Sequence, residues 1–149
     1  MTALPSPRPR VKAQVAHFLG LARSSEEQLL DALVLFAERH SRDFDLSGGA
    51  TIVASWPRDH IERLKLLVER YGAVPSDQPE RLRAALLSGT RMGAAGSLHD
   101  LQDLSLLAEQ VSMAWTILFQ GGKELHDDDL LALSADAREH TRRTLQWLR

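Results

Sequence analysis

Apolar residues recur every three or four positions along four long segments of this sequence, and this spacing is the strongest constraint on the fold. The segment from Ser97 to Gly121 shows it most clearly, with apolar side chains at Leu101, Leu104, Ala108, Val111, Trp115 and Leu118. Such a pattern places one apolar stripe along a helix. Alternation with a period of two, which a half-buried strand requires, is not sustained over any length. The sequence therefore predicts an all-α protein.

The chain has 149 residues, a length that suits one domain with a single core. Its 44% hydrophobic and 26% charged residues are ordinary for a folded globular protein. Prolines at positions 5, 7 and 9 make the first ten residues unsuited to a strand or a helix interior. We therefore expect residues 1–10 to be a disordered arm and residues 11–149 to form a single helical-bundle domain.

Charge and cysteine content argue against several function classes. The formal net charge is −2, whereas nucleic-acid-binding proteins concentrate lysine and arginine on one face. Without cysteine there are no disulfides, no thiolate catalysis and no cysteine-held zinc or iron–sulfur cluster. No apolar run approaches the roughly 18 residues of a membrane span, and the first charges are not followed by a signal-type apolar region. We expect a cytoplasmic location, with neither nucleic acid nor membrane as a partner.

Local signals predict the helices of the first half. A short amphipathic helix is expected from Val11, followed by a long helix over 25–44 that Ser24 and Glu27 begin as a capping box. The inward stripe of this long helix is predicted at Leu29, Leu33, Phe36, His40 and Phe44.

The second long helix is predicted to end at Gly72, which precedes Pro75. Pro57 leaves two alternatives for its first half, because a proline removes one backbone hydrogen bond and clashes one turn back. Either the helix kinks there, or its regular part begins near Ser55 as N-cap.

In the second half, a short crossover helix is predicted over 77–89, and the glycine-rich GTRMGAAG links it to a third long helix. Ser97 and Asp100 are expected to cap this third helix, which the glycines at 121 and 122 would end. The aspartates at 127–129 are expected to open the last helix, where negative charge meets the positive end of the helix dipole.

Two stretches, LLDALVLFAERHSRDFDL and SLHDLQDLSLLAEQVSMAWTILFQGG, together with the later LQWLR, resemble a group of small uncharacterised bacterial proteins with ferritin-like bundles. The resemblance covers about residues 24–149. It implies an antiparallel ferritin-like four-helix bundle, here with a short N-terminal helix and a short crossover helix, and it implies no activity.

Ferritin-like di-iron proteins place Glu-x-x-His pairs on two of their helices, so the three positions before each histidine can be tested for this motif. The residues three positions before the six histidines are Gln14, Ala37, Pro57, Gly96, Lys123 and Ala137. None is a carboxylate, so the sequence lacks the usual di-iron motif.

Three histidines, His40, His60 and His140, fall on the predicted apolar stripes, where an imidazole needs a hydrogen-bond partner or a ligand. With a turn near residue 47, His60 would lie roughly 9 Å further from that turn than His40. These two meet only if the helix restarts at Pro57. A haem bound by His40 or His60 is one further alternative.

Glu109 and His140 are predicted to lie nearly level on the two sides of a turn near residue 124. With Asp136 and Glu139 they form the best candidate cluster of carboxylates and imidazole, suited to one metal ion or to acid–base chemistry. A histidine satisfied by a core carboxylate explains the same pattern without any function.

A weaker candidate is an anion-binding loop in which glycines and a following helix start, with Arg91 and Ser97, would hold a phosphate or similar group. A flexible link explains these glycines equally well. The run HDDD at 126–129 is better explained by helix capping than by metal binding.

We therefore expect a non-catalytic binding or structural bundle with an unknown ligand and no cofactor. A protein partner or self-association is expected, with a homodimer as one form, since Trp147 near the end of the chain is a candidate interface residue. The alternative is a metal-dependent oxidoreductase or metal-binding protein with iron or manganese at a non-standard site.

Overall fold

The computed structural model describes residues 8–73 and 93–149, with side chains in the second range from residue 99 onward. Within these ranges every regular element is a helix, which confirms the predicted all-α class: α1 (Arg8–Arg39), α2 (Phe44–Tyr71), α4 (Gly93–Leu125) and α5 (Asp128–Leu148). Across the described ranges, no helix combines the length and apolar character that spanning a membrane demands.

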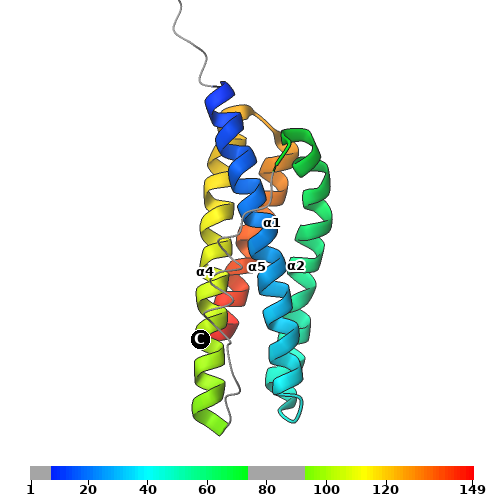
Figure 1. Ribbon diagram of the computed structural model, residues 1–149, viewed down its shortest axis with the longest axis vertical. Helices are drawn as coiled ribbons and strands as arrows, with labels where there is room; N and C mark the ends of the chain where they lie inside the picture. The colour runs from blue at the N-terminus through cyan, green and yellow to red at the C-terminus, as the bar shows by residue number, and fades with distance from the viewer. Residues whose placement is uncertain (1–7, 74–92) are drawn as a thin grey trace, which may run out of the picture.

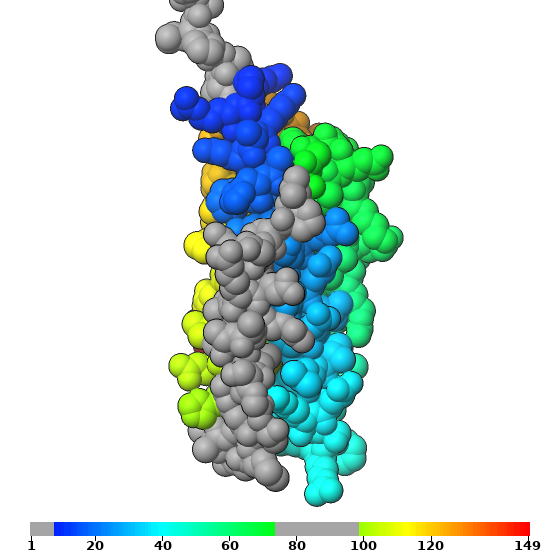
Figure 2. Space-filling model, viewed as in Figure 1, coloured from blue at the N-terminus to red at the C-terminus, as the bar shows by residue number. Residues whose placement is uncertain are grey.

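The four helices form one bundle (Figure 1). α1 packs along both α2 and α4, while α5 packs along α4 and, over a smaller contact, against α2. Figure 2 shows α1 running along one face beside α2. α2 ends and α4 begins at opposite ends of the bundle, so these two helices run in the same direction and every adjacent pair is antiparallel (Figure 1). The predicted antiparallel helical bundle is thus confirmed.

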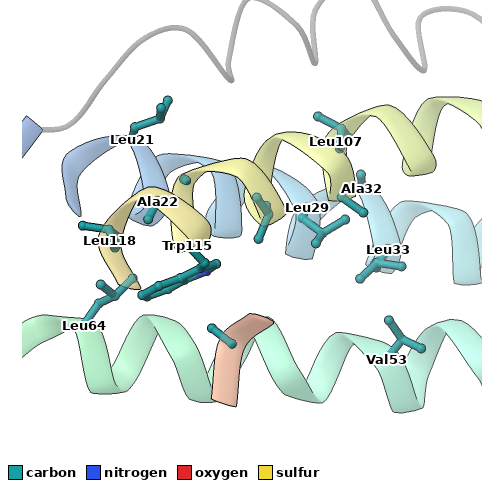
Figure 3. Packing of buried hydrophobic residues seen from close by; sticks show 14 of the residues in the cluster. Leu21, Ala22, Leu29, Ala32, Leu33, Val53, Leu64, Leu107, Trp115 and Leu118 are labelled. Atoms are coloured by element: carbon teal, nitrogen blue, oxygen red, sulfur yellow. The ribbon is translucent and has the colours of Figure 1, made fainter. Parts of the chain in front are cut away.

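The core consists mainly of leucine and alanine side chains on the inward stripes of the helices. Trp115 is the largest fully buried side chain, and it projects from α4 toward α2 near Leu64 and Leu118 (Figure 3). Most of the predicted α4 stripe is buried, namely Leu104, Ala108, Val111, Trp115 and Leu118. Removing this apolar surface from water, at roughly 25 cal/mol per Å², is the main stabilising contribution.

α1 is a single helix where the sequence predicts two. It runs without a break from Arg8 to Arg39, so the expected lead-in helix and the helix over 25–44 are a single element, and the last three residues of the expected arm are helical. Ser24 is buried in the middle of α1 and is not an N-cap. The apolar stripe continues upstream of it at Val15, Leu19 and Ala22. Burial of this longer stripe outweighs the local capping signal.

α2 begins earlier than predicted. Asp43 is its N-cap and accepts the backbone N–H groups of Asp45 and Leu46, so the turn between α1 and α2 ends there and not near residue 47. Phe44 is consequently the first residue of α2, and its side chain is 87% exposed rather than part of the core.

Pro57 lies inside α2, and the helix does not restart at Ser55. Its ring is buried, so packing offsets part of the cost of the N–H group that proline lacks. The predicted end of α2 is confirmed, because Gly72 adopts a left-handed conformation with φ 62° and caps the helix by donating to Glu69 and Val68 carbonyl groups.

α4 extends beyond both predicted ends. It begins at Gly93, so Ser97 does not cap it, and it passes through the two glycines at 121 and 122 to Leu125. A Cβ on Gly121 would lie 2.6 Å from Cγ2 of Val15, which shows how closely α1 and α4 approach. The glycine serves this helix contact instead of ending the helix. The predicted crossover helix over 77–89 lies outside the described residues.

The start of α5 is as predicted. Asp127 is its N-cap and accepts the backbone N–H of Leu130. The same carboxylate accepts hydrogen bonds from Arg70 and from the Tyr71 hydroxyl, at 2.8 and 2.5 Å. Asp127 therefore joins the last turn of α2 to the first turn of α5.

Candidate functional site

Glu26, His60 and His140 form a hydrogen-bonded row across the bundle, called here the polar triad. They come from α1, α2 and α5 respectively. Nδ1 of His60 lies 2.8 Å from Oε1 of Glu26, and Nε2 of His60 lies 2.8 Å from Nδ1 of His140. Glu26 and His60 are each 1% exposed, whereas His140 is only half-buried. The triad therefore connects the core of the bundle with its surface.

The Glu26 carboxylate receives two ring N–H groups on one oxygen. Trp115 of α4 donates its Nε1–H to Oε1 over 2.8 Å, and His60 approaches the same oxygen. The other oxygen, Oε2, is buried and has no hydrogen-bond partner among the described residues. All four described helices thus contribute to one polar cluster inside an otherwise apolar core.

The pattern of hydrogen bonds assigns the protons of the triad. Trp115 can only donate and an ionised carboxylate can only accept, so Nδ1 of His60 donates to Glu26. In a neutral His60 ring Nε2 is then the acceptor, and Nδ1 of His140 donates to it. Nε2 of a neutral His140 is consequently left with a free lone pair.

The two imidazole rings meet edge to edge. Their planes differ by 13° and their centres lie 5.1 Å apart. The 2.8 Å separation of the two nitrogens is shorter than the distance between stacked rings, so the rings are nearly coplanar and the N–H of His140 points along the lone pair of His60. This is a well-aligned path for sharing a proton.

His140 is the outer end of the triad. Its Nε2 makes no hydrogen bond with any described residue, and the His140 side chain is partly exposed. Trp56 lies parallel to the ring, with an interplanar angle of 4° and centres 5.2 Å apart. Partial burial, and then the nearby His60, lower the pKa of His140 below its usual value of 6.5. His140 is therefore a neutral imidazole at neutral pH.

The charges around His140 are largely balanced. Asp59 and Asp136 oppose the lowering of its pKa, and Arg143 adds to it. Arg63 pairs with both aspartates, at 3.5 and 2.9 Å. Arg63 thus offsets one of the two negative charges that Asp59 and Asp136 place close to His140.

A second buried carboxylate meets a second histidine elsewhere in the bundle. Asp100 of α4 is fully buried, and its Oδ2 lies 3.1 Å from Nε2 of His40, while Arg39 approaches its Oδ1 at 3.5 Å. The His40 ring also contacts Phe36, with centres 4.3 Å apart. An ion pair between α1 and α4 explains this arrangement.

The predicted cluster around Glu109 is only partly assembled. Glu109 is exposed on α4 and makes no hydrogen bond with His140. Asp136 pairs with Arg63, and Glu139 pairs with Arg142 and Arg143, whose hydrogen bonds lower the pKa of Glu139 to about 2. His140 meets His60, which was predicted on the same kind of stripe but not as its partner.

The remaining predicted residues are separated from the triad. His40 and His60 do not meet, because α2 does not restart at Pro57. Arg91 lies outside the described residues, and so does the side chain of Ser97.

Sequence reasoning missed Glu26 and Asp100 for one shared reason. Asp100 matches a capping signature with Ser97, and Glu26 lies inside the capping box that Ser24 and Glu27 match, so both positions are predicted at a helix start. Both fall on inward stripes once the helices are extended, as Ala22, Glu26, Leu29 and Leu33 show for α1. A polar residue at such a stripe position was the signal for the site.

Among the described residues, no group of three or more histidine, aspartate or glutamate side chains is arranged to hold a metal ion. No family model, curated protein or solved structure gives a significant match to this chain. The resemblance to ferritin-like proteins therefore stays a prediction.

Proposed function

We propose that this protein is a non-catalytic, ferritin-like helical bundle that binds a partner or small ligand through the His140 imidazole. The observation that carries this proposal is the polar triad, which runs from a buried carboxylate to an open ring nitrogen. The connectivity supports the ferritin-like part, because ferritin-like bundles have one long crossover between two helices that run in the same direction.

The energetic cost of the triad argues for a role beyond stability. Burying a carboxylate such as that of Glu26 inside a protein is costly even when hydrogen bonds compensate part of the lost hydration. In addition, the unpartnered Oε2 of Glu26 costs about 1–3 kcal/mol. A bundle selected only for a stable core has no need of these groups.

The position of His140 supports binding more than small-molecule catalysis. Four grooves on the described part of the bundle, beside Ile117, Val34, Leu66 and Arg70, are not lined by His140. Active sites for small substrates are usually concave. A half-buried ring on a helix face suits contact with a larger partner, and the parallel Trp56 ring offers an aromatic surface beside it.

Metal binding is the second candidate function, favoured by one observation. A metal-bound histidine often donates its other N–H to a carboxylate, and Glu26 holds His60 in this way. Iron or manganese in an oxidoreductase stays an alternative on this ground.

The two candidates are separated by measurements on protein purified without a histidine tag. We expect substoichiometric iron, manganese and zinc, and thermal stabilisation by a compound from a panel of acids and phosphates that is lost in His140→Gln. Equal stabilisation of both proteins would contradict the role of His140. A stoichiometric metal that His140→Ala removes would contradict the non-catalytic proposal.

A further inference from the structure

We propose that Nε2 of His140 accepts a phosphoryl group from an acyl phosphate carried by a partner protein. The inference rests on the proposed role of His140 as the binding group and adds the chemistry of the partner. It draws on three features of the site: the open nitrogen, the support behind it and the balance of charge around it.

The first feature is a nucleophilic nitrogen held in position. A histidine attacks phosphorus through a ring nitrogen with a free lone pair, so it must be neutral and its other nitrogen must carry the proton. His140 meets this requirement, because its Nδ1–H is bound to His60, while Nε2 makes no hydrogen bond with a described residue and the side chain is partly exposed. Trp56 packs parallel to the ring and restricts its rotation.

The second feature is the support for the positive charge that forms. When Nε2 attacks, a P–N bond forms, the P–O bond to the acyl group breaks, and the carboxylate leaves with that electron pair. No proton is lost, and the imidazole becomes a cation that keeps Nδ1–H. His60 accepts this N–H, and Glu26 at its far side places a negative charge where it stabilises the cation.

The third feature is the electrostatic surroundings. A phosphoryl donor is anionic and is repelled by unpaired carboxylates. Asp59 and Asp136 are both paired with Arg63, and Arg143 stands one turn after His140 with 56% of its side chain exposed. Rotation of Arg143 away from Glu139 would place a guanidinium near the incoming phosphoryl group.

The open placement of His140 favours a protein as the donor. A small phosphoryl donor reaches His140 only by collision and reacts there slowly, whereas a donor on another protein brings its own active site. An aspartyl phosphate is the simplest donor of this kind, since its acyl phosphate bond transfers readily to an imidazole.

The test uses the full chain with acetyl phosphate, and in parallel with phosphoramidate, as small phosphoryl donors. Intact mass at neutral pH and peptide mapping of the wild-type protein identify the modified residue directly, so the result does not depend on the fold of a variant. His17 and His126 are exposed histidines without a carboxylate-backed partner, and they serve as internal controls.

We expect one acid-labile phosphoryl group on His140, added at least about ten-fold faster than on either control histidine. Glu26→Gln should slow this labelling more than it slows labelling of His17, while His17→Gln should leave His140 labelling unchanged. The proposal is overturned if neither donor labels His140, or if His17 and His126 react as fast. If His140 stays unlabelled but a panel compound still stabilises wild type and not His140→Gln, only the phosphoryl proposal fails.

Discussion

The indole of Trp147 occupies the space in which a side chain on Gly49 would stand. An ideal Cβ on Gly49 would lie 2.8 Å from Cε2 of this indole, whereas a Cβ on Gly48 would meet nothing within 4 Å. Trp147 also meets Phe36 edge to face, with ring centres 6.2 Å apart. The last turn of α5 is thereby packed onto the start of α2. At least part of Trp147, the candidate interface residue, therefore packs within the bundle.

Gly49→Ala is expected to destabilise the protein by about 1–3 kcal/mol, because the new methyl group overlaps the Trp147 ring. Gly48→Ala is the matched control and should stabilise by roughly 0.5–1 kcal/mol, since alanine favours the helix and meets no obstacle. Urea unfolding measures both. Similar effects of the two substitutions would show that Trp147 does not pack as described.

Glu26→Ala is expected to cost about 3–5 kcal/mol, because it leaves the buried N–H groups of His60 and Trp115 without their acceptor. Glu26→Gln keeps an acceptor oxygen and should cost less. The adjacent Glu27 is the control: it is about half-exposed and paired with Arg23, so Glu27→Ala should cost about 0.5 kcal/mol or less. Chemical unfolding that ranks Glu27→Ala with Glu26→Ala would contradict the buried position of the triad.

Stability should fall as the pH is lowered below about 6.5, through the contribution of His140. Its pKa is lower in the folded protein than the usual 6.5, so between the two values the unfolded chain binds more protons than the folded one. The stability difference is fully present above 6.5 and is lost as the pH falls toward the folded pKa. Comparing unfolding free energies of wild type and His140→Gln across this window isolates the effect; parallel curves would rule it out.

Asp127→Ala is expected to destabilise by about 1–2 kcal/mol or more, since it removes the N-cap of α5 and the acceptor for Arg70 and Tyr71. Asp127→Asn retains a capping oxygen and should recover part of this loss. Asp128→Ala is the control, because Asp128 lies in the first turn but is not the cap. Asp127→Ala should also lower the raised pKa of Tyr71, which depends on burial and on the hydrogen bond to Asp127. Spectrophotometric titration of the tyrosine measures this change.

Helices and their ends could be predicted from the sequence wherever an apolar stripe ended at a local start or stop signal. The end of α2 at Gly72 and the start of α5 at Asp127 are examples, because a left-handed glycine and a capping aspartate act through local backbone geometry. In α5, five residues that recur at helical spacing in the sequence are all buried, namely Leu130, Leu133, Ala137, Thr144 and Leu148.

The starts of α1, α2 and α4 could not be predicted, because tertiary packing decided them. Ser24 and Ser97 both carry the local signature of a helix start, yet both lie inside longer helices. A capping bond is worth about 1 kcal/mol, and several buried turns of a helix outweigh it. The turn between α1 and α2 ends at Asp43, earlier than predicted. Residues of these two helices therefore lie opposite other positions across the bundle than the sequence suggested.

This shift is also why the candidate site was only partly foreseen. His60 and His140 were recognised as inward histidines, but Glu26, the partner of His60, lies some fifteen residues before a turn that the sequence placed too late. A Glu-x-x-His motif pairs two residues of the same helix, whereas the acidic partners of His60 and His40 come from neighbouring helices.

The hydrogen bond from Trp115 to Glu26 allows the interior of this protein to be monitored by tryptophan fluorescence. An indole whose N–H rests on a carboxylate changes its fluorescence when the charge on that carboxylate changes. With Trp56 and Trp147 replaced by phenylalanine, emission from the one remaining indole would report, without any attached dye, whatever His140 encounters at the surface.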